Sequence, residues 1–224
     1  MKSILLFILT MLSATNIVGQ IGLIKDKDGW TNVRAEPNGS AEVIHRIKVG
    51  ELFWYDFEVN IEKVEWIEVY VPKDNFTLNG YEGKSYVGFI HSSRLIELSE
   101  LEQYEGDNFK FEYFISEFDS TGRVFTYQDN KWPIAIDNRF MWGTDGYFPY
   151  SQLDSIIITL DNQLIDVDKS LYDDLFNVRT DMEIYRIEDL YVVYHWNSDG
   201  AGGYEIAWVI DKYGIRQRLL GASI

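Results

Sequence analysis

The clearest structural signal in the chain is the run at residues 65–71, which reads Glu65-Trp66-Ile67-Glu68-Val69-Tyr70-Val71. Successive side chains of a β-strand point to opposite faces, so the three β-branched residues share one face and the two aromatic residues lie with Glu68 on the other. This pattern predicts a strand that is buried on one side and partly exposed on the other. Pro72 follows and ends the strand, because proline cannot donate a backbone hydrogen bond.

Similar short runs, separated by turn residues, extend from this strand in both directions. In the first half, residues 51–59 and 86–91 are further strand candidates. Residues 168–176 alone have helical character, with Asp168 as N-cap. The chain is therefore predicted to be mainly all-β and antiparallel with one short helix. Strands of the second half are expected at residues 110–118, 123–127, 132–136, 155–160, 163–167, 183–187, 190–196, 204–211 and 215–220.

An acidic segment divides the two halves. Residues 99–108 carry four carboxylates and few apolar side chains, which is typical of a solvated linker. We therefore predict an N-terminal domain at residues 20–98, an acidic linker at 99–108, and a β-rich domain of unknown function at 109–224.

Several short segments of the first half carry a family resemblance. They are Gly29-Trp30-Thr31-Asn32-Val33-Arg34, Pro37, Val43-Ile44, Ile47, Gly50, Trp66-Ile67-Glu68-Val69, Gly88-Phe89-Ile90-His91-Ser92-Ser93 and Leu95. In this order they make residues 22–98 similar to the bacterial SH3-like (SH3b) family of exported proteins. The resemblance implies a small β-barrel, often with a cell-wall peptide or glycan as its ligand. Long connections at residues 60–64 and 72–83 depart from the family pattern, and so does Phe89 where Trp is commoner.

Four aromatic residues of this half are the candidate ligand-binding positions, namely Trp30, Trp66, Tyr70 and Tyr86. Stacking and phenol hydroxyl groups suit a shallow groove that holds a peptide or a sugar. The alternative is that these rings pack across strands and against the second domain. The sequence leaves both interpretations open.

The first nineteen residues resemble a cleavable signal peptide. Lys2 precedes an apolar run at residues 4–12 that is too short to span a bilayer, and small residues follow up to Gly19. We expect cleavage near Gly19, export to the periplasm or the medium, and no integral membrane segment after cleavage. The chain contains no Cys, so the exported protein must be held together by packing without disulfides.

Charge and composition exclude several kinds of chemistry. With 36 acidic and 20 basic residues the net charge is −16, which disfavours nucleic acid and suits a neutral or cationic partner. His45, His91 and His195 stand alone, without the spacing of a metal site. The sequence therefore predicts no catalytic residue, no metal and no cofactor. Carboxylate pairs for glycoside hydrolysis stay open in residues 109–224, because their pairing is spatial.

The segment at residues 196–205 joins two predicted strands through small residues. It resembles C-terminal regions of exported bacterial proteins that have no assigned activity. Asp199 and Glu205 are possible calcium ligands, but acidic residues are too few at alternating positions, so a glycine-rich turn is favoured.

These observations predict an exported, non-catalytic binding protein whose SH3-like domain docks cell-wall peptide or glycan, with peptidoglycan fragments or an envelope protein as partner. Two alternatives stay open. One is an inhibitor or immunity-type factor directed at a basic protein, and the other is an unrecognised glycan hydrolase in residues 109–224.

Overall fold

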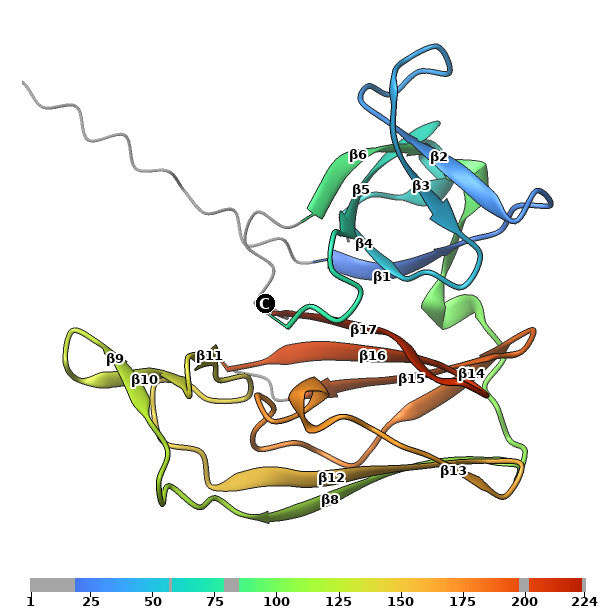
Figure 1. The fold of residues 1–224 in the computed structure, drawn as a ribbon. Coiled ribbons are helices and arrows are strands. Elements are labelled where there is room, and N and C mark those ends of the chain that lie inside the picture. Colours follow the sequence, from blue (N-terminus) through green and yellow to red (C-terminus); the bar gives the residue numbers. More distant parts are fainter. Residues whose placement is uncertain (1–18, 57, 79–84, 198–201, 223–224) are drawn as a thin grey trace, which may run out of the picture.

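The computed structural model describes residues 19–56, 58–78, 85–197 and 202–222, and within them the chain is all-β. The described helices are four 3-10 segments of three residues each, and none of them is long and apolar enough to cross a membrane. Apart from Gly19, with which β1 begins, the predicted signal peptide lies outside the described residues. The strands form two bodies, one above the other in Figure 1.

The N-terminal body is one seven-stranded antiparallel sheet in the order β3-β2-β6-β5-β4-β1-β7. Its core contains the inward residues Ile67, Val69 and Val71, as the alternation at residues 65–71 predicts. The strands are β1 Gly19–Ile24, β2 Trp30–Arg34, β3 Val43–Lys48, β4 Phe53–Asp56, β5 Trp66–Pro72, β6 Ser85–His91 and β7 Leu95–Glu97.

The sheet curls around its core but is not a closed barrel. Strands β3 and β7 are its two ends, and no ladder among the described residues joins them. The predicted small barrel is therefore corrected to an open sheet. The physical reason lies in β7, which has three residues and leads directly into the 3-10 segment η3 at Leu98–Glu100. Leu98 is buried in a core shared with the second body, so the chain leaves before β7 can extend toward β3.

The C-terminal body contains two antiparallel sheets packed face to face on one core. One is β14-β15-β16-β17 and the other is β13-β12-β8, while β9, β10 and β11 form a small third sheet at one end (Figure 1). Two-residue turns such as Asp161-Asn162, both with positive φ, join neighbouring strands. The strands are β8 Phe109–Glu117, β9 Phe125–Gln128, β10 Trp132–Ile136, β11 Arg139–Phe140, β12 Ser151–Leu160, β13 Gln163–Ile165, β14 Glu183–Ile187, β15 Leu190–Asn197, β16 Tyr204–Asp211 and β17 Gly214–Ala222.

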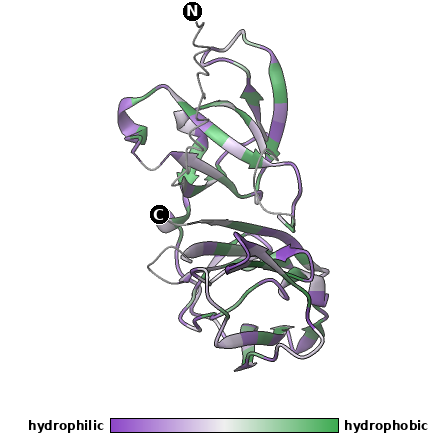
Figure 2. Ribbon diagram, turned by 90° about the vertical axis from the view of Figure 1, so that its left-hand side faces the viewer, coloured by the Kyte–Doolittle hydropathy of each residue, from purple (hydrophilic) through white to green (hydrophobic). Residues whose placement is uncertain are grey.

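The four-stranded sheet is buried on both faces, which makes it the middle layer of the molecule. In β16, Ile206 and Trp208 belong to the core shared with β8 and β12, whereas Ala207 and Val209 belong to the core shared with the N-terminal body. Figure 2 shows the polar and apolar segments of the two stacked bodies. A strand buried on both faces reads as a continuous apolar run, as residues 206–210 do.

Two predicted segments differ in the structure. The expected helix at residues 168–176 is only the 3-10 turn η4 at Lys169–Leu171, although Asp168 does cap it by accepting a hydrogen bond from Ser170 N at 2.8 Å. The acidic segment 99–108 runs along the edge strand β14: Tyr104 N donates to Ile184 O at 2.7 Å and the Tyr104 ring packs on the core. Its apolar and aromatic side chains therefore dock it in place.

The two bodies are joined by a side-chain amide that imitates a strand pairing. Gln217 Nε2 donates to Leu52 O and Leu52 N donates to Gln217 Oε1, each at 2.8 Å and each buried. Both backbone groups of Leu52 are satisfied in this way although no strand pairs with them there. The contact fixes the orientation of the N-terminal body on β17.

Replacing Gln217 by alanine is expected to lower the free energy of unfolding by about 2 kcal/mol, because it leaves a buried N–H and a buried C=O without partners. Urea unfolding of the full chain measures this, with Gln163→Ala, an exposed glutamine of β13, as the control. A Gln217→Ala loss no larger than that of Gln163→Ala would show that the contact does not hold the bodies together.

Candidate functional site

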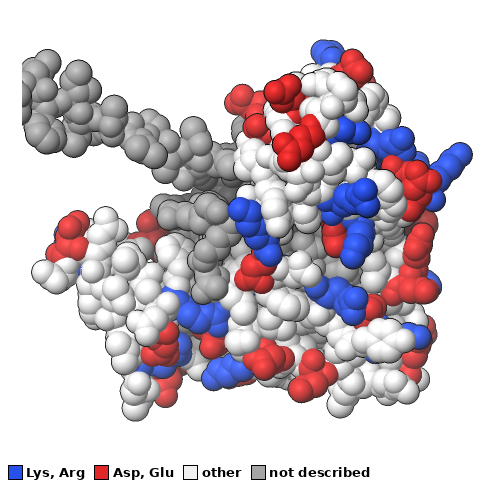
Figure 3. All heavy atoms as spheres, turned by 45° about the horizontal axis from the view of Figure 1, so that its top comes forward, with Lys and Arg blue, Asp and Glu red and all other residues white. Residues whose placement is uncertain are grey.

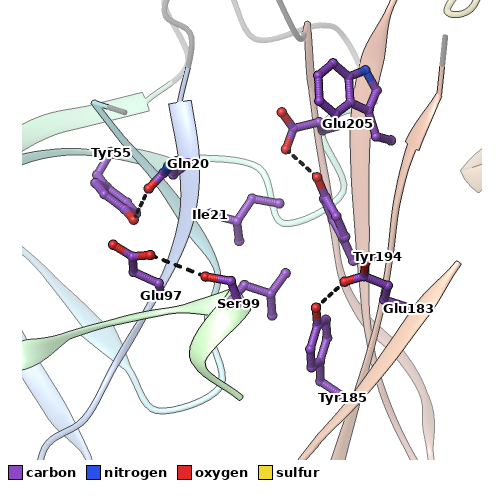
Figure 4. Close-up of a pocket in the computed structure, with 11 residues that line it drawn as sticks. Gln20, Ile21, Tyr55, Glu97, Ser99, Glu183, Tyr185, Tyr194 and Glu205 are labelled. Atoms are coloured by element: carbon purple, nitrogen blue, oxygen red, sulfur yellow. Dashed lines mark hydrogen bonds between the residues drawn. The ribbon is translucent and has the colours of Figure 1, made fainter. Parts of the chain in front are cut away.

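A cleft of about 270 Å³ opens between the two bodies, and it is the candidate functional site. Figure 4 shows the side chains of the N-terminal body on one side and those of the four-stranded sheet on the other. The lining is rich in carboxylates and aromatic rings. It consists of Gln20, Ile21, Tyr55, Glu97, Leu98 and Ser99 from one body and Glu183, Tyr185, Tyr194, Trp196 and Glu205 from the other.

Strand register places the second wall. Glu183 of β14 is opposite Tyr194 of β15, and Trp196 of β15 is opposite Glu205 of β16. Directly opposite residues of an antiparallel pair point to the same face, so these four side chains form one surface toward the N-terminal body. Glu183 and Glu205 are thus two strands apart, with Tyr194 between them.

The first wall is formed by β1, β4 and the end of β7. The Tyr55 hydroxyl donates to Gln20 Oε1 at 2.5 Å, and Ser99 Oγ donates to Glu97 Oε2 at 3.3 Å. Burial and then the charge of Glu97 raise the pKa of Tyr55 above its ordinary value. The phenol therefore remains a neutral hydrogen-bond donor beside a carboxylate.

Each carboxylate of the second wall is held by a phenol. Tyr194 donates to Glu205 Oε2 at 3.0 Å, and Tyr185 donates to Glu183 Oε2. Burial, followed by the neighbouring glutamate, raises the pKa of Tyr194 well above its ordinary value and that of Tyr185 to about 12. In each glutamate the phenol occupies one oxygen, which fixes the carboxylate and leaves its other oxygen for a ligand.

Glu205 is the most desolvated of the three glutamates. Burial raises its pKa above the ordinary value, and the hydrogen bond from Tyr194 opposes that effect. An approaching positive charge stabilises the ionised form of such a buried carboxylate, because it replaces the water that burial has removed.

Trp196 adds an aromatic surface at the rim. Its indole is 55% exposed although Asn197 beside it is fully buried, so the ring is available to a ligand. Carboxylates combined with an indole face suit an ammonium or guanidinium group, through charge and cation–π attraction. Within the described residues no group of three or more His, Asp or Glu is placed to hold a metal ion, so the three glutamates do not converge on one point.

No family model matches this chain, and neither the curated proteins nor the solved structures contain a significant match to it.

The four aromatic residues predicted to bind a ligand lie at separate places, and none of them lines the cleft. Trp66 and Tyr70 share the outer face of β5, where the Tyr70 hydroxyl donates to Glu68 Oε2 at 2.6 Å. Trp30 lies at the start of β2 under the Arg46 guanidinium, 4.3 Å from the ring centroid.

Tyr86 lies on the opposite face of the same sheet. It pairs with Val71 in the ladder, packs on the core of the N-terminal body, and stacks on His45 with ring centroids 4.2 Å apart. The structure therefore does not assemble Trp30, Trp66, Tyr70 and Tyr86 into one groove, and their role in ligand binding stays a prediction.

The cleft residues were not among the predicted ligand positions, with Glu205 considered only as a calcium ligand. Asp199 lies outside the described residues, and Glu205 points into the cleft beside Tyr194. The residues that line the cleft are as far apart in the sequence as Gln20 and Glu205, so no local sequence motif marks the site. The available signal was the alternation Glu183-x-Tyr185 and Tyr194-x-Trp196, which puts polar and aromatic side chains on one face of paired strands.

Proposed function

We propose that this protein is an exported, non-catalytic binding protein that holds a cationic group of its partner, a lysine or arginine side chain, in the cleft between its two bodies. The observation that carries the proposal is the placement of Glu97, Glu183 and Glu205 with the exposed indole of Trp196 around one cavity. The leader-like residues 1–19 support the exported location.

The charge of the chain favours the same kind of partner. A net charge of −16 attracts a basic molecule over distances up to the Debye length, about 8 Å at physiological salt. Figure 3 shows basic side chains interspersed with acidic ones on one face, so overall charge alone gives no single docking point there. The cleft supplies that point, because the described residues that line it include three glutamates and neither Lys nor Arg.

The two walls of the cleft are also packed on a shared core, which favours affinity. The shared core beneath it contains Leu52 and Leu98 of one body and Val192 and Leu219 of the other, and the Gln217 amide adds two buried hydrogen bonds. A preformed site avoids the cost of ordering its walls when the ligand binds.

Of the functions expected from the sequence, the one that this geometry supports best is an inhibitor or immunity-type factor directed at a basic protein or peptide. Docking of wall peptide or glycan through Trp30, Trp66, Tyr70 and Tyr86 stays a prediction. Hydrolysis is less well supported, since Glu183 and Glu205 stand on either side of the Tyr194 phenol, which is hydrogen-bonded to one of them.

Titration calorimetry of the full chain with a pentalysine peptide tests the proposal. We expect saturable binding that weakens with salt, and no binding of the peptide with acetylated lysines, which keeps its length and loses its charge. Trp196→Ala and Glu183→Gln are each expected to weaken binding about tenfold, or 1.4 kcal/mol.

Two control variants separate the cleft from general acidity. Glu112→Gln removes the same charge from an exposed position of β8, and Tyr213→Ala removes an exposed ring at the opposite end of β16. Both should bind as the unmodified chain does. Equal losses in Glu183→Gln and Glu112→Gln would mean that binding is non-specific and would contradict the proposal.

A further inference from the structure

A second concave site lies in the C-terminal body, away from the cleft. It is a groove of about 400 Å³ on the small β9–β11 sheet, which extends to one side of the molecule in Figure 1. Its walls include three aromatic rings and three polar side chains. These are Trp132, Phe140 and Tyr147 together with Gln128, Thr144 and Asp145.

The rings are exposed but held in place. Phe140 is 55% and Tyr147 66% exposed, whereas a ring that only packs the core would be covered. Tyr147 meets Trp132 edge to face with centroids 5.8 Å apart, and Phe140 meets the buried Trp142 in the same way at 4.9 Å. These contacts fix the direction of each ring before any ligand arrives.

The loop beside the groove passes close to the Trp132 indole at Gly146. Gly146 has φ +65°, and a Cβ on it would stand 3.3 Å from Trp132 Cε3. The Lys131 ammonium lies 4.1 Å from the centroid of the Trp132 ring. The indole is thus positioned between the loop and a lysine.

The polar groups of the groove define what the ligand must offer. Asp145 only accepts hydrogen bonds when ionised, while the Gln128 amide and the Thr144 hydroxyl both donate and accept. A matching ligand presents apolar faces to the rings and, at its edges, hydroxyl groups that donate as well as accept. We propose that this groove binds a pyranose ring of an oligosaccharide.

A proline-rich peptide is the competing occupant, because such segments also dock in aromatic grooves. Its proline residues offer carbonyl acceptors and no N–H donors. Asp145 would then be covered without a partner, which costs free energy. The Asp145 carboxylate therefore favours a sugar, whose hydroxyl groups donate hydrogen bonds, over a proline-rich peptide.

The test titrates the full chain with chitotetraose, cellotetraose, maltotetraose and decaproline, each followed by calorimetry up to roughly 10 mM, where a millimolar Kd is visible. We expect at least one oligosaccharide to bind. Phe140→Ala and Tyr147→Ala should each weaken that binding about tenfold, and Asp145→Asn should weaken it several-fold. Phe114→Ala and Asp107→Asn, at exposed positions of β8 and of the acidic segment, should leave it unchanged.

Binding of decaproline alone, or of none of the four probes, would overturn the proposal. So would oligosaccharide binding that survives both aromatic substitutions. Far-UV circular dichroism of each variant confirms that it is folded, and because both rings are exposed their removal takes no side chain out of the buried core. The result is independent of the cleft, because Trp196→Ala should bind the sugar as the unmodified chain does.

Discussion

Methionine in place of Arg218 is expected to lower the free energy of unfolding by about 3–5 kcal/mol, the largest effect of any substitution considered for this chain. Arg218 is fully buried, and its Nη2 lies 2.7 Å from the Asp174 carboxylate, which is itself buried. Removing the Arg218 guanidinium leaves the Asp174 carboxylate as a buried charge. Among the described residues, only Arg139, whose Nη2 lies 2.8 Å from Asp174 Oδ2, then balances that charge.

The same arginine also joins the two bodies. Its backbone N donates to Asn75 O at 2.8 Å, its carbonyl accepts from Thr77 Oγ1 at 2.8 Å, and its Nη1 donates to Phe76 O at 3.2 Å. Arg216→Met is the matched control, two residues earlier in β17 with a side chain 60% exposed, and should change stability by less than about 0.5 kcal/mol. Similar unfolding midpoints in urea for the two variants would show that the buried pair is dispensable.

Acidification is expected to destabilise the protein through His195. This side chain is 2% exposed, and burial lowers its pKa from the ordinary 6.5 to about 4, against a weaker opposing effect of Asp181. The unfolded chain therefore takes up a proton at His195 as the pH falls below 6.5, while the folded chain does not. Stability that is complete above this pH is lost on acidification, by about 2 kcal/mol between about pH 7.5 and about pH 5.

The hydrogen bonds around His195 explain why the neutral ring is favoured. Trp208 Nε1 donates to the Tyr113 hydroxyl at 2.9 Å, so that hydroxyl donates its own proton to His195 Nε2, also at 2.9 Å. Burial raises the pKa of Tyr113, which keeps that donor protonated. The proton of the imidazole is then on Nδ1, which has no hydrogen-bond partner among the described residues.

The unfolding free energy of the unmodified chain and of His195→Gln, measured across this pH range, tests the prediction. His195→Gln should lose the part of the pH dependence of the unfolding free energy that comes from His195. The control His91→Gln, which replaces a half-exposed histidine, should keep it. An NMR titration of the unmodified chain gives a second readout that does not depend on the variant folding. A His195 pKa near 6.5 would contradict the account.

Local pattern was sufficient to predict most strands. The expected ranges 132–136, 183–187 and 204–211 coincide with β10, β14 and β16, because alternation and flanking turn residues fix strand position directly. The predicted helix at residues 168–176 was wrong in length. One pair of leucines a turn apart and a cap residue suffice for a single 3-10 turn. The path of residues 172–178 after that turn is set by their packing against the core.

The arrangement of the sheets could not be predicted from local sequence patterns, because it depends on contacts between residues far apart in the chain. Whether β7 closes on β3 depends on where Leu98 is buried, and Leu98 is buried against a sheet more than eighty residues later in the chain. The cleft has the same origin, since Glu97 and Glu205 become neighbours of one cavity only through that docking. The continuous apolar run at residues 206–210 was the one sequence signal that a further layer covers β16.

The most direct test of the central claim, that the cleft is the binding site for a cationic group, follows the indole N–H resonances of the seven tryptophans by NMR during titration with pentalysine. The account predicts that the Trp196 resonance shifts most, with saturation, and that those of Trp30 and Trp66 stay in place. Shifts of Trp30 and Trp66 with an unmoved Trp196 would place the site on the N-terminal sheet and contradict it.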